Sequence, residues 1–200
     1  MNLPQILQTI SPFLFMVIPL IVIPKIIKGL ATPNATTFLI RSIVAIINMV
    51  TYFFMTNQEW FKSLIMVTST LSLVSIFLAC VIKNGFGGIN TVDKICALTA
   101  LISIIVWKLS NPMMANMMVQ VVIVISAVPT IQGVVSGRNK EIPLPWMIAS
   151  SGYALSLIAL ILQDSGIPSM VNLVVCIIIN TSIGLIAHDK NKKRILNSNL

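Results

Sequence analysis

Seven long apolar segments run along this chain, and they limit it to a helical fold in a lipid bilayer. Each has about the 20 residues that an α-helix needs to cross the hydrocarbon core. Only 9% of the 200 residues are charged and the mean hydropathy is +0.97, so a soluble domain is excluded. We therefore expect an all-α integral membrane protein with seven transmembrane helices, at residues 10–30, 36–56, 61–82, 92–109, 113–135, 143–162 and 167–187.

The distribution of the 13 lysines and arginines predicts how these helices are oriented. If the loops are assigned alternately to the two sides of the bilayer, only Lys62 and Lys108 fall on the side that is poor in basic residues. Lys and Arg are retained on the cytoplasmic side, so we expect the N-terminus outside and the C-terminus inside, with residues 189–200 as a basic cytoplasmic tail. This pattern accounts for the net charge of +8, and a lipid bilayer, not a nucleic acid, is the expected partner.

A pattern near residue 24 returns near residue 129 and predicts an internal repeat. In both places a proline lies near the end of an apolar helix and is followed by a basic loop broken by glycine or proline; Pro24 and Pro129 are 105 residues apart. We expect two three-helix repeats, at 1–83 and 112–188, joined by a linker helix within 84–111. An odd number of crossings separates their starts, so the repeats are parallel and are related by an axis along the membrane normal.

This 3+1+3 arrangement resembles the SWEET sugar facilitators of the PQ-loop (MtN3-like) superfamily. The resemblance covers nearly the whole chain and rests on the topology and on a Pro-x-Ile sequence near the ends of the first and fifth helices. Pro24 and Pro129 match the prolines at the PQ position of the family, although Lys25 and Thr130 replace its glutamine. Pro145, at the start of the expected sixth helix, matches the proline that the family carries in the second helix of a repeat. The resemblance implies passive sugar transport, with no cofactor.

Polar side chains at membrane depth are the candidate solute contacts, because they are costly in lipid and tend to face a bundle interior. Asn172 matches a pocket asparagine of the resembled family, and Asn48 and Tyr153 lie 105 residues apart at corresponding depths. We expect these three residues to bind the substrate. Asn180 and Gln120 are expected to link helices instead, since a buried amide needs partners for its donors and its acceptor.

The expected mechanism is rocking of the two repeats around three hinge prolines, Pro24, Pro129 and Pro145, because a proline removes a backbone hydrogen bond and loosens its helix. No Asp or Glu falls inside an expected span, which predicts a neutral pocket and passive transport without proton coupling. Arg41 is expected to reach the cytoplasmic headgroups, with a gate or an anionic contact as the alternative. The predicted function is uniport of a small neutral solute, a mono- or disaccharide, by alternating access.

Two other classes of protein remain open, a ligand or cargo receptor and a structural membrane subunit on the same scaffold. An enzyme is not expected, because the spans hold no acid or histidine that would serve as a catalytic base or a metal ligand. The three cysteines lie singly in or beside apolar segments and predict neither a disulfide nor a metal site. The plasma or inner cell membrane is the expected location, and a homo-oligomer is left open.

Overall fold

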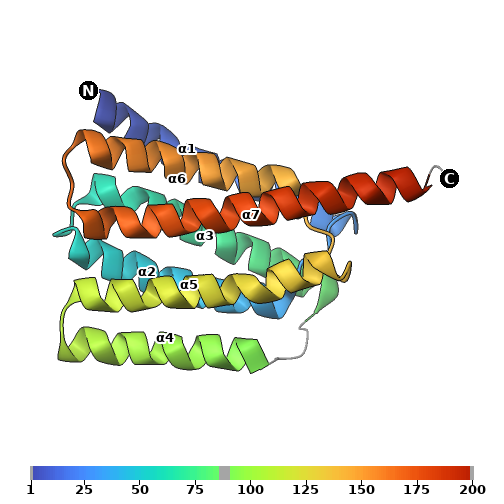
Figure 1. The fold of residues 1–200 in the computed structure, drawn as a ribbon, viewed down its shortest axis with the longest axis horizontal. Coiled ribbons are helices and arrows are strands. Elements are labelled where there is room, and N and C mark those ends of the chain that lie inside the picture. Colours follow the sequence, from blue (N-terminus) through green and yellow to red (C-terminus); the bar gives the residue numbers. More distant parts are fainter. Residues whose placement is uncertain (1, 86–90, 199–200) are drawn as a thin grey trace.

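The structure is a computed structural model that describes residues 2–85 and 91–198, and Figure 1 shows these residues as a bundle of helices running side by side. Among the described residues, six of the helices are long and apolar enough to cross a membrane, all of them except α4. The described chain contains no strand, which confirms the all-α class. The helices are α1 (Leu3–Ile27), α2 (Ala35–Met55), α3 (Trp60–Asn84), α4 (Thr91–Leu109), α5 (Pro112–Val135), α6 (Pro143–Leu162) and α7 (Ile167–Ser198).

The first helix begins earlier than the apolar pattern predicts. α1 starts at Leu3 because Asn2 and Gln5 form a capping box: Gln5 N donates to Asn2 Oδ1 at 3.1 Å, and Asn2 N donates to Gln5 Oε1 at 3.2 Å. α5 begins in a related way, since the Asn111 side chain accepts from Met114 N at 2.9 Å. These caps set helix starts that apolar runs alone do not show.

The end of the chain corrects another expectation. Residues 189–198, expected as a separate tail, continue α7 without a break, so that this helix extends past its neighbours (Figure 1). Asp189 and Lys193, one turn apart, form an ion pair at 3.0 Å. Asn191 Nδ2 donates to Glu141 O at 3.1 Å and Arg194 Nη2 to Gly137 O at 3.0 Å, so the extension is tied to the loop between α5 and α6. Of the linker expected at 84–111, residues 86–90 lie outside the described part of the chain.

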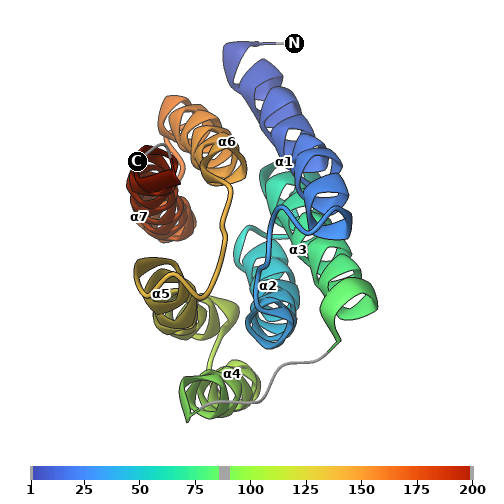
Figure 2. The ribbon, with the colours of Figure 1, turned by 90° about the vertical axis from the view of Figure 1, so that its right-hand side faces the viewer.

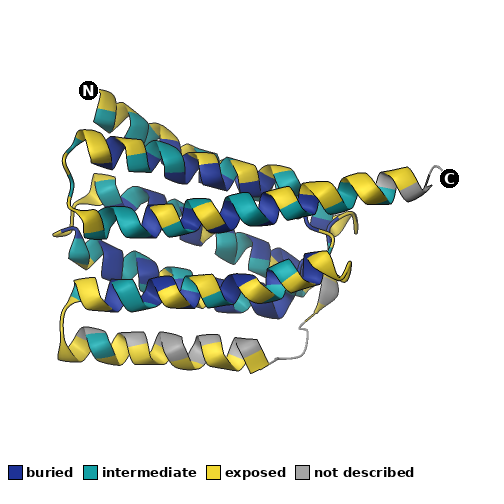
Figure 3. Cartoon of the chain, in the orientation of Figure 1, coloured by how far each residue is buried: buried dark blue, intermediate teal, exposed yellow. Residues whose placement is uncertain are grey.

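Contacts between neighbours close six helices into a ring. α1 contacts α3 and α6, α2 contacts α3 and α5, and α7 contacts α5 and α6. Figure 2 shows the bundle end-on, with α4 outside the ring against its two neighbours, α2 and α5. Each ring helix buries a face toward the interior and exposes another, as Figure 3 shows. Large apolar side chains cover the outer faces, for example Leu20 at 74% exposure and Ile82 at 86%, which is stable only where lipid is the solvent.

Gly152 allows α1 and α6 to approach closely. A Cβ at this position would lie 2.6 Å from Phe15 Cε2 and 3.4 Å from the Ser11 carbonyl oxygen. The Phe15 ring instead packs edge-on against Tyr153, with the ring centroids 4.8 Å apart. This small residue therefore brings an aromatic pair from two helices to the centre of the ring.

Candidate functional site

A cavity of about 100 Å³ lies inside the six-helix ring. About 10–15 Å³ of such space holds one water, so there is room for several waters or a small solute. All six ring helices contribute to the wall, which is mainly apolar. The uncharged polar residues of the wall come from α2, α3, α5, α6 and α7 and include Asn48, Ser69, Thr70, Ser72, Ser126, Tyr153 and Asn180.

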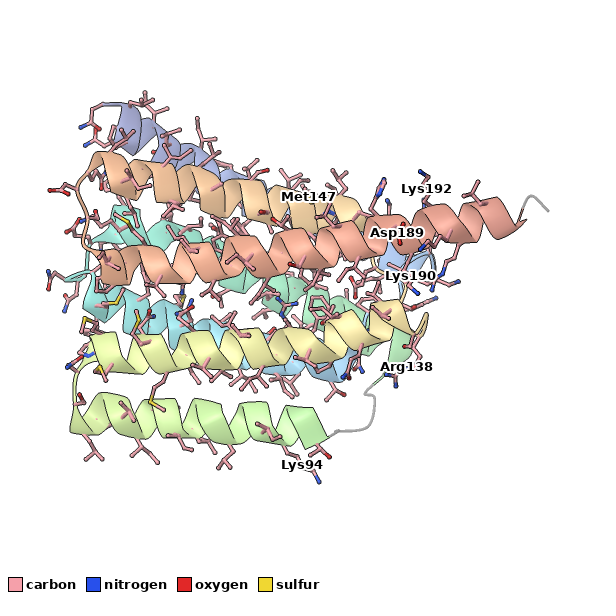
Figure 4. All side chains as sticks on the ribbon, in the orientation of Figure 1. Lys94, Arg138, Met147, Asp189, Lys190 and Lys192 are labelled. Atoms are coloured by element: carbon pink, nitrogen blue, oxygen red, sulfur yellow. The ribbon has the colours of Figure 1, made fainter. Side chains whose placement is uncertain are left out.

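The cavity occupies the half of the bundle nearer to the 28–34 and 136–142 loops. Ala31 and Glu141 from these loops lie in its wall, and Asn48 and Tyr153 lie at its deep end, toward the middle of α2 and α6. Figure 4 shows Lys94, Arg138, Lys190 and Lys192 at the same side of the molecule. We call this side the basic end; it carries Lys25, Lys28, Lys83, Lys94, Arg138, Lys140, Lys190, Lys192, Lys193 and Arg194.

Two oppositely charged side chains line the cavity, and both contact Trp146. Trp146 Nε1 donates to Glu141 Oε2 at 3.2 Å, and the guanidinium carbon of Arg41 lies 4.9 Å from the centroid of the Trp146 ring. Arg41 and Glu141 are each only 9% exposed. Within the described chain no ion pair joins them, and Nη1 of Arg41 and Oε1 of Glu141 have no hydrogen-bond partner.

This arrangement corrects two expectations from the sequence. The pocket is not neutral, and Arg41 turns into the cavity instead of reaching the headgroups. The reason is tertiary: the 136–142 loop folds over the basic end of the ring and carries Glu141 into the wall, and Trp146 at the start of α6 gives the guanidinium an aromatic face. Glu141 lies in a loop between two expected helices, but it is buried and not exposed to water.

Burial raises the pKa of Glu141 from 4.5 to about 6, although the hydrogen bond from Trp146 and the charge of Arg41 oppose the change. An acid whose folded-state pKa is raised stabilises the fold at low pH and loses that contribution as the pH rises through the folded value. The effect is fully present below pH 4.5 and is lost by just above pH 6. At neutral pH, the ionised carboxylate therefore reduces the stability of the protein.

We expect Glu141→Gln to remove this pH dependence. From pH 4.5 to just above pH 6, the wild type should lose about 2 kcal/mol of unfolding free energy relative to the variant, since one pKa unit corresponds to about 1.4 kcal/mol. Unfolding in detergent micelles between pH 4 and pH 8 measures this difference. Glu59→Gln, at the opposite end of the bundle, is the control variant. A difference between wild type and Glu141→Gln that does not change with pH would contradict the prediction.

Asn48 is also the centre of a buried amide cluster beyond the cavity. Its Oδ1 accepts from Asn116 Nδ2 at 3.0 Å, from Gln120 Nε2 at 3.2 Å and from Asn172 Nδ2 at 2.7 Å. Asn116 Nδ2 also donates to Thr51 Oγ1 at 3.1 Å. The cluster ties α2 to α5 and α7, and it blocks the ring beyond the deep end of the cavity.

The structure brings two of the three expected binding residues into one wall. Asn48 and Tyr153 line the cavity, whereas Asn172 is fully buried outside the wall and bonds two residues of the wall, donating to Asn48 and accepting from Cys176. Gln120 links helices as expected. Asn180 instead lines the cavity and donates within α7, to Cys176 O at 2.6 Å.

The three expected hinge prolines occupy different positions relative to the cavity. Pro24 lies inside α1 and Pro129 inside α5, and neither belongs to the cavity wall. Pro145 lies in the first turn of α6 and does line the cavity. A hinge role for these prolines stays a prediction.

Trp146 was the main residue that sequence reasoning missed. Trp146 lies near the start of α6 and is not among the expected binding residues, Asn48, Tyr153 and Asn172. A signal for it was present in the sequence, because Arg41 and Trp146 are 105 residues apart, the same spacing as Asn48 and Tyr153 and the spacing of the expected repeat. Two residues at this spacing thus contact each other.

Comparison with models of known families, with curated proteins and with solved structures gives no match. Among the described residues, no group of three His, Cys, Asp or Glu side chains is placed to hold a metal ion. The polar side chains in the wall are its amides, its hydroxyls and those of Arg41, Trp146 and Glu141.

Proposed function

We propose that this chain is a carrier that moves a small polar solute across a membrane by alternating access. The cavity is the observation that carries the proposal: it is enclosed by six helices with apolar outer faces, yet amides, hydroxyls and two charged side chains line it. Polar groups at membrane depth are costly and mark solute pathways. A bundle that only had to be stable in lipid would gain more from an apolar core.

A repeated pair of contacts supports the division into two three-helix units, 1–83 and 112–188, with α4 as the linker. The Phe15 ring packs on Tyr153, and the Gln120 side chain bonds Asn48. Residues 15 and 120 are 105 apart, and so are residues 48 and 153. Each contact joins the two units, and a shift of 105 residues converts one contact into the other, as parallel repeats around a central axis require.

With the N-terminus outside, the basic end of the molecule faces the cytoplasm, and the cavity lies in the half of the bundle nearer to it. The other end is closed by bonds between the two units: Tyr52 Oη donates to Ser169 O at 3.1 Å, and Gln8 Nε2 donates to Gln163 Oε1 at 3.1 Å. The amide cluster around Asn48 is a third set of hydrogen bonds that joins the two units. The structure then corresponds to a carrier closed on the outside, and transport requires these bonds to break while contacts at the basic end tighten.

A mono- or disaccharide is the solute class that we propose to test first. Asn48, Tyr153 and Asn180 offer donors and acceptors for hydroxyl groups, and the apolar wall suits the carbon faces of a sugar ring. The alternative, a receptor on the same scaffold, predicts binding without transfer.

The test is uptake of radiolabelled glucose and sucrose into proteoliposomes, with and without an imposed pH gradient. Saturable uptake that is indifferent to the gradient supports passive transport. Uptake that follows the gradient and loses this dependence in Glu141→Gln would show proton coupling instead. Binding of a sugar without uptake would favour the receptor, and no uptake of any neutral or polar solute would exclude a carrier.

We expect Tyr153→Ala and Asn172→Ala to lower uptake about tenfold each, which corresponds to about 1.4 kcal/mol. The first removes a cavity side chain and the packing partner of Phe15, and the second removes the shortest hydrogen bond to Asn48. Initial uptake rates, corrected for the amount of reconstituted protein, measure the effect. Ser75→Ala is the control, since Ser75 does not line the cavity and its hydroxyl, within the described chain, bonds only Leu71 O of its own helix. If both variants keep wild-type uptake, the pocket assignment is wrong.

A further inference from the structure

We infer that the basic end of the cavity is a site for a small zwitterion, whose anionic group binds Arg41 and whose cationic group binds Glu141. The inference rests on the proposed function in one respect, because it names a further solute class for the same cavity. It concerns binding, so it is tested without transport.

The first argument is that both charges are buried and incompletely paired. Arg41 and Glu141 are more than nine-tenths buried, and each keeps one atom, Nη1 and Oε1, without a protein partner in the described chain. A buried charge is costly unless it is paired and hydrogen-bonded. Both atoms belong to side chains in the wall of one cavity, where a ligand can supply the missing partners.

The second argument is that Trp146 contacts both charges. Its ring face lies under the Arg41 guanidinium, and its Nε1, at the edge of the ring, donates to Glu141 Oε2. Within the described chain the two charges form no direct salt bridge with each other. A ligand with one positive and one negative group on a short carbon frame complements both charges at once.

The third argument concerns ligands with only one charge. A simple anion drawn to Arg41 would also approach the Glu141 carboxylate, and a simple cation drawn to Glu141 would approach the guanidinium. Repulsion between like charges opposes binding in each case, so the pair of Arg41 and Glu141 selects against simple anions and simple cations. Apolar wall residues, among them Phe38 and Ile76, would cover the carbon frame of the ligand.

The site also has a defined dependence on pH. The titratable and charged groups that interact with Glu141 are Arg41 from α2 and Cys80 from α3, and Tyr153 from α6 and Cys176 from α7 interact with Arg41. The cationic group of a ligand needs the ionised carboxylate, and burial raises the pKa of Glu141 to about 6. Zwitterion binding should therefore weaken as the pH falls through about 6.

The experiment uses the full chain in detergent micelles with Trp60 and Trp107 replaced by phenylalanine, so that Trp146 reports on the cavity. The ligands are glycine and γ-aminobutyrate, with acetate and ethylamine as probes that carry one charge, and glucose as a neutral probe. We expect a saturable change of Trp146 fluorescence for at least one zwitterion, with at least tenfold weaker binding of acetate and ethylamine. R41Q should abolish the change, and E141Q should bind the zwitterion no better than acetate.

Equal binding of acetate and glycine, or a response to glucose alone, would overturn the inference. The ligand panel on the wild-type cavity decides the matter even if R41Q does not fold, and R41K provides a second variant that keeps the charge. Sugar uptake without zwitterion binding would remove only this inference. Zwitterion binding without uptake of any solute would remove only the proposed transport.

Discussion

Replacing Asn48 with leucine is expected to lower the free energy of unfolding by about 3 kcal/mol. Leucine branches at the same carbon as asparagine but offers no acceptor, so the loss comes mainly from three amide donors, on Asn116, Gln120 and Asn172, that share the Asn48 oxygen as acceptor. Interhelical hydrogen bonds in membranes contribute about 0.6 kcal/mol on average, and a buried group left unsatisfied costs about 1–3 kcal/mol. Unfolding in mixed micelles, followed by circular dichroism, measures the change.

Ser75→Ala serves as the control for this prediction too and should stay within about 0.5 kcal/mol of the wild type. A loss below about 1 kcal/mol for Asn48→Leu would mean that the amides find other partners. The same variant should also lower uptake, because the cluster lies at the deep end of the cavity.

Trp146→Ala is expected to lower solute uptake about 100-fold while the protein remains folded. The variant removes the aromatic face under Arg41, worth up to about 2 kcal/mol when desolvated, and the N–H donor to Glu141, worth about 1 kcal/mol. Together these approach the roughly 2.7 kcal/mol that separates rates by a factor of 100. Without the indole, Arg41 and Glu141 lose the side chain that contacts both of them.

Two matched variants isolate this effect in the same proteoliposome assay. Trp60→Ala removes an exposed indole at the opposite end of the bundle and should leave uptake near the wild-type value. Trp146→Phe keeps a ring for Arg41 but loses the donor to Glu141, so its uptake should lie between those of wild type and Trp146→Ala. Equal uptake by Trp146→Ala and Trp60→Ala would contradict a role for the charged pair in transport.

The class of fold could be predicted from the sequence because lipid as solvent demands long apolar helices, and such helices leave a direct record in composition. Helix ends were less accessible. α1 starts at a cap formed by Asn2 and Gln5, and residues 189–198 continue α7 although they are highly charged. Neither feature depends on apolar character, so apolar runs did not reveal them.

The candidate site could be predicted in part. Asn48 and Tyr153 line the cavity because polar residues at membrane depth tend to face the interior of the bundle. Glu141 could not be placed, because a loop acid reaches a cavity only through the path of the folded chain. Asn172 illustrates another limit. The sequence indicates how deep a residue lies in the bilayer, but it does not indicate whether another side chain separates that residue from the cavity.

The contact between Arg41 and Trp146 also bears on why such a site belongs in a single chain. A dimer of identical three-helix units would set every residue near its twofold axis against its own copy. At this position that symmetry allows only arginine against arginine or tryptophan against tryptophan. In the proposed arrangement two such units are joined covalently, and their sequences can diverge where they meet, so that a cation can rest on an aromatic ring and a single carboxylate can approach from one side. Asymmetry at the axis then lets the cavity tell one end of a solute from the other.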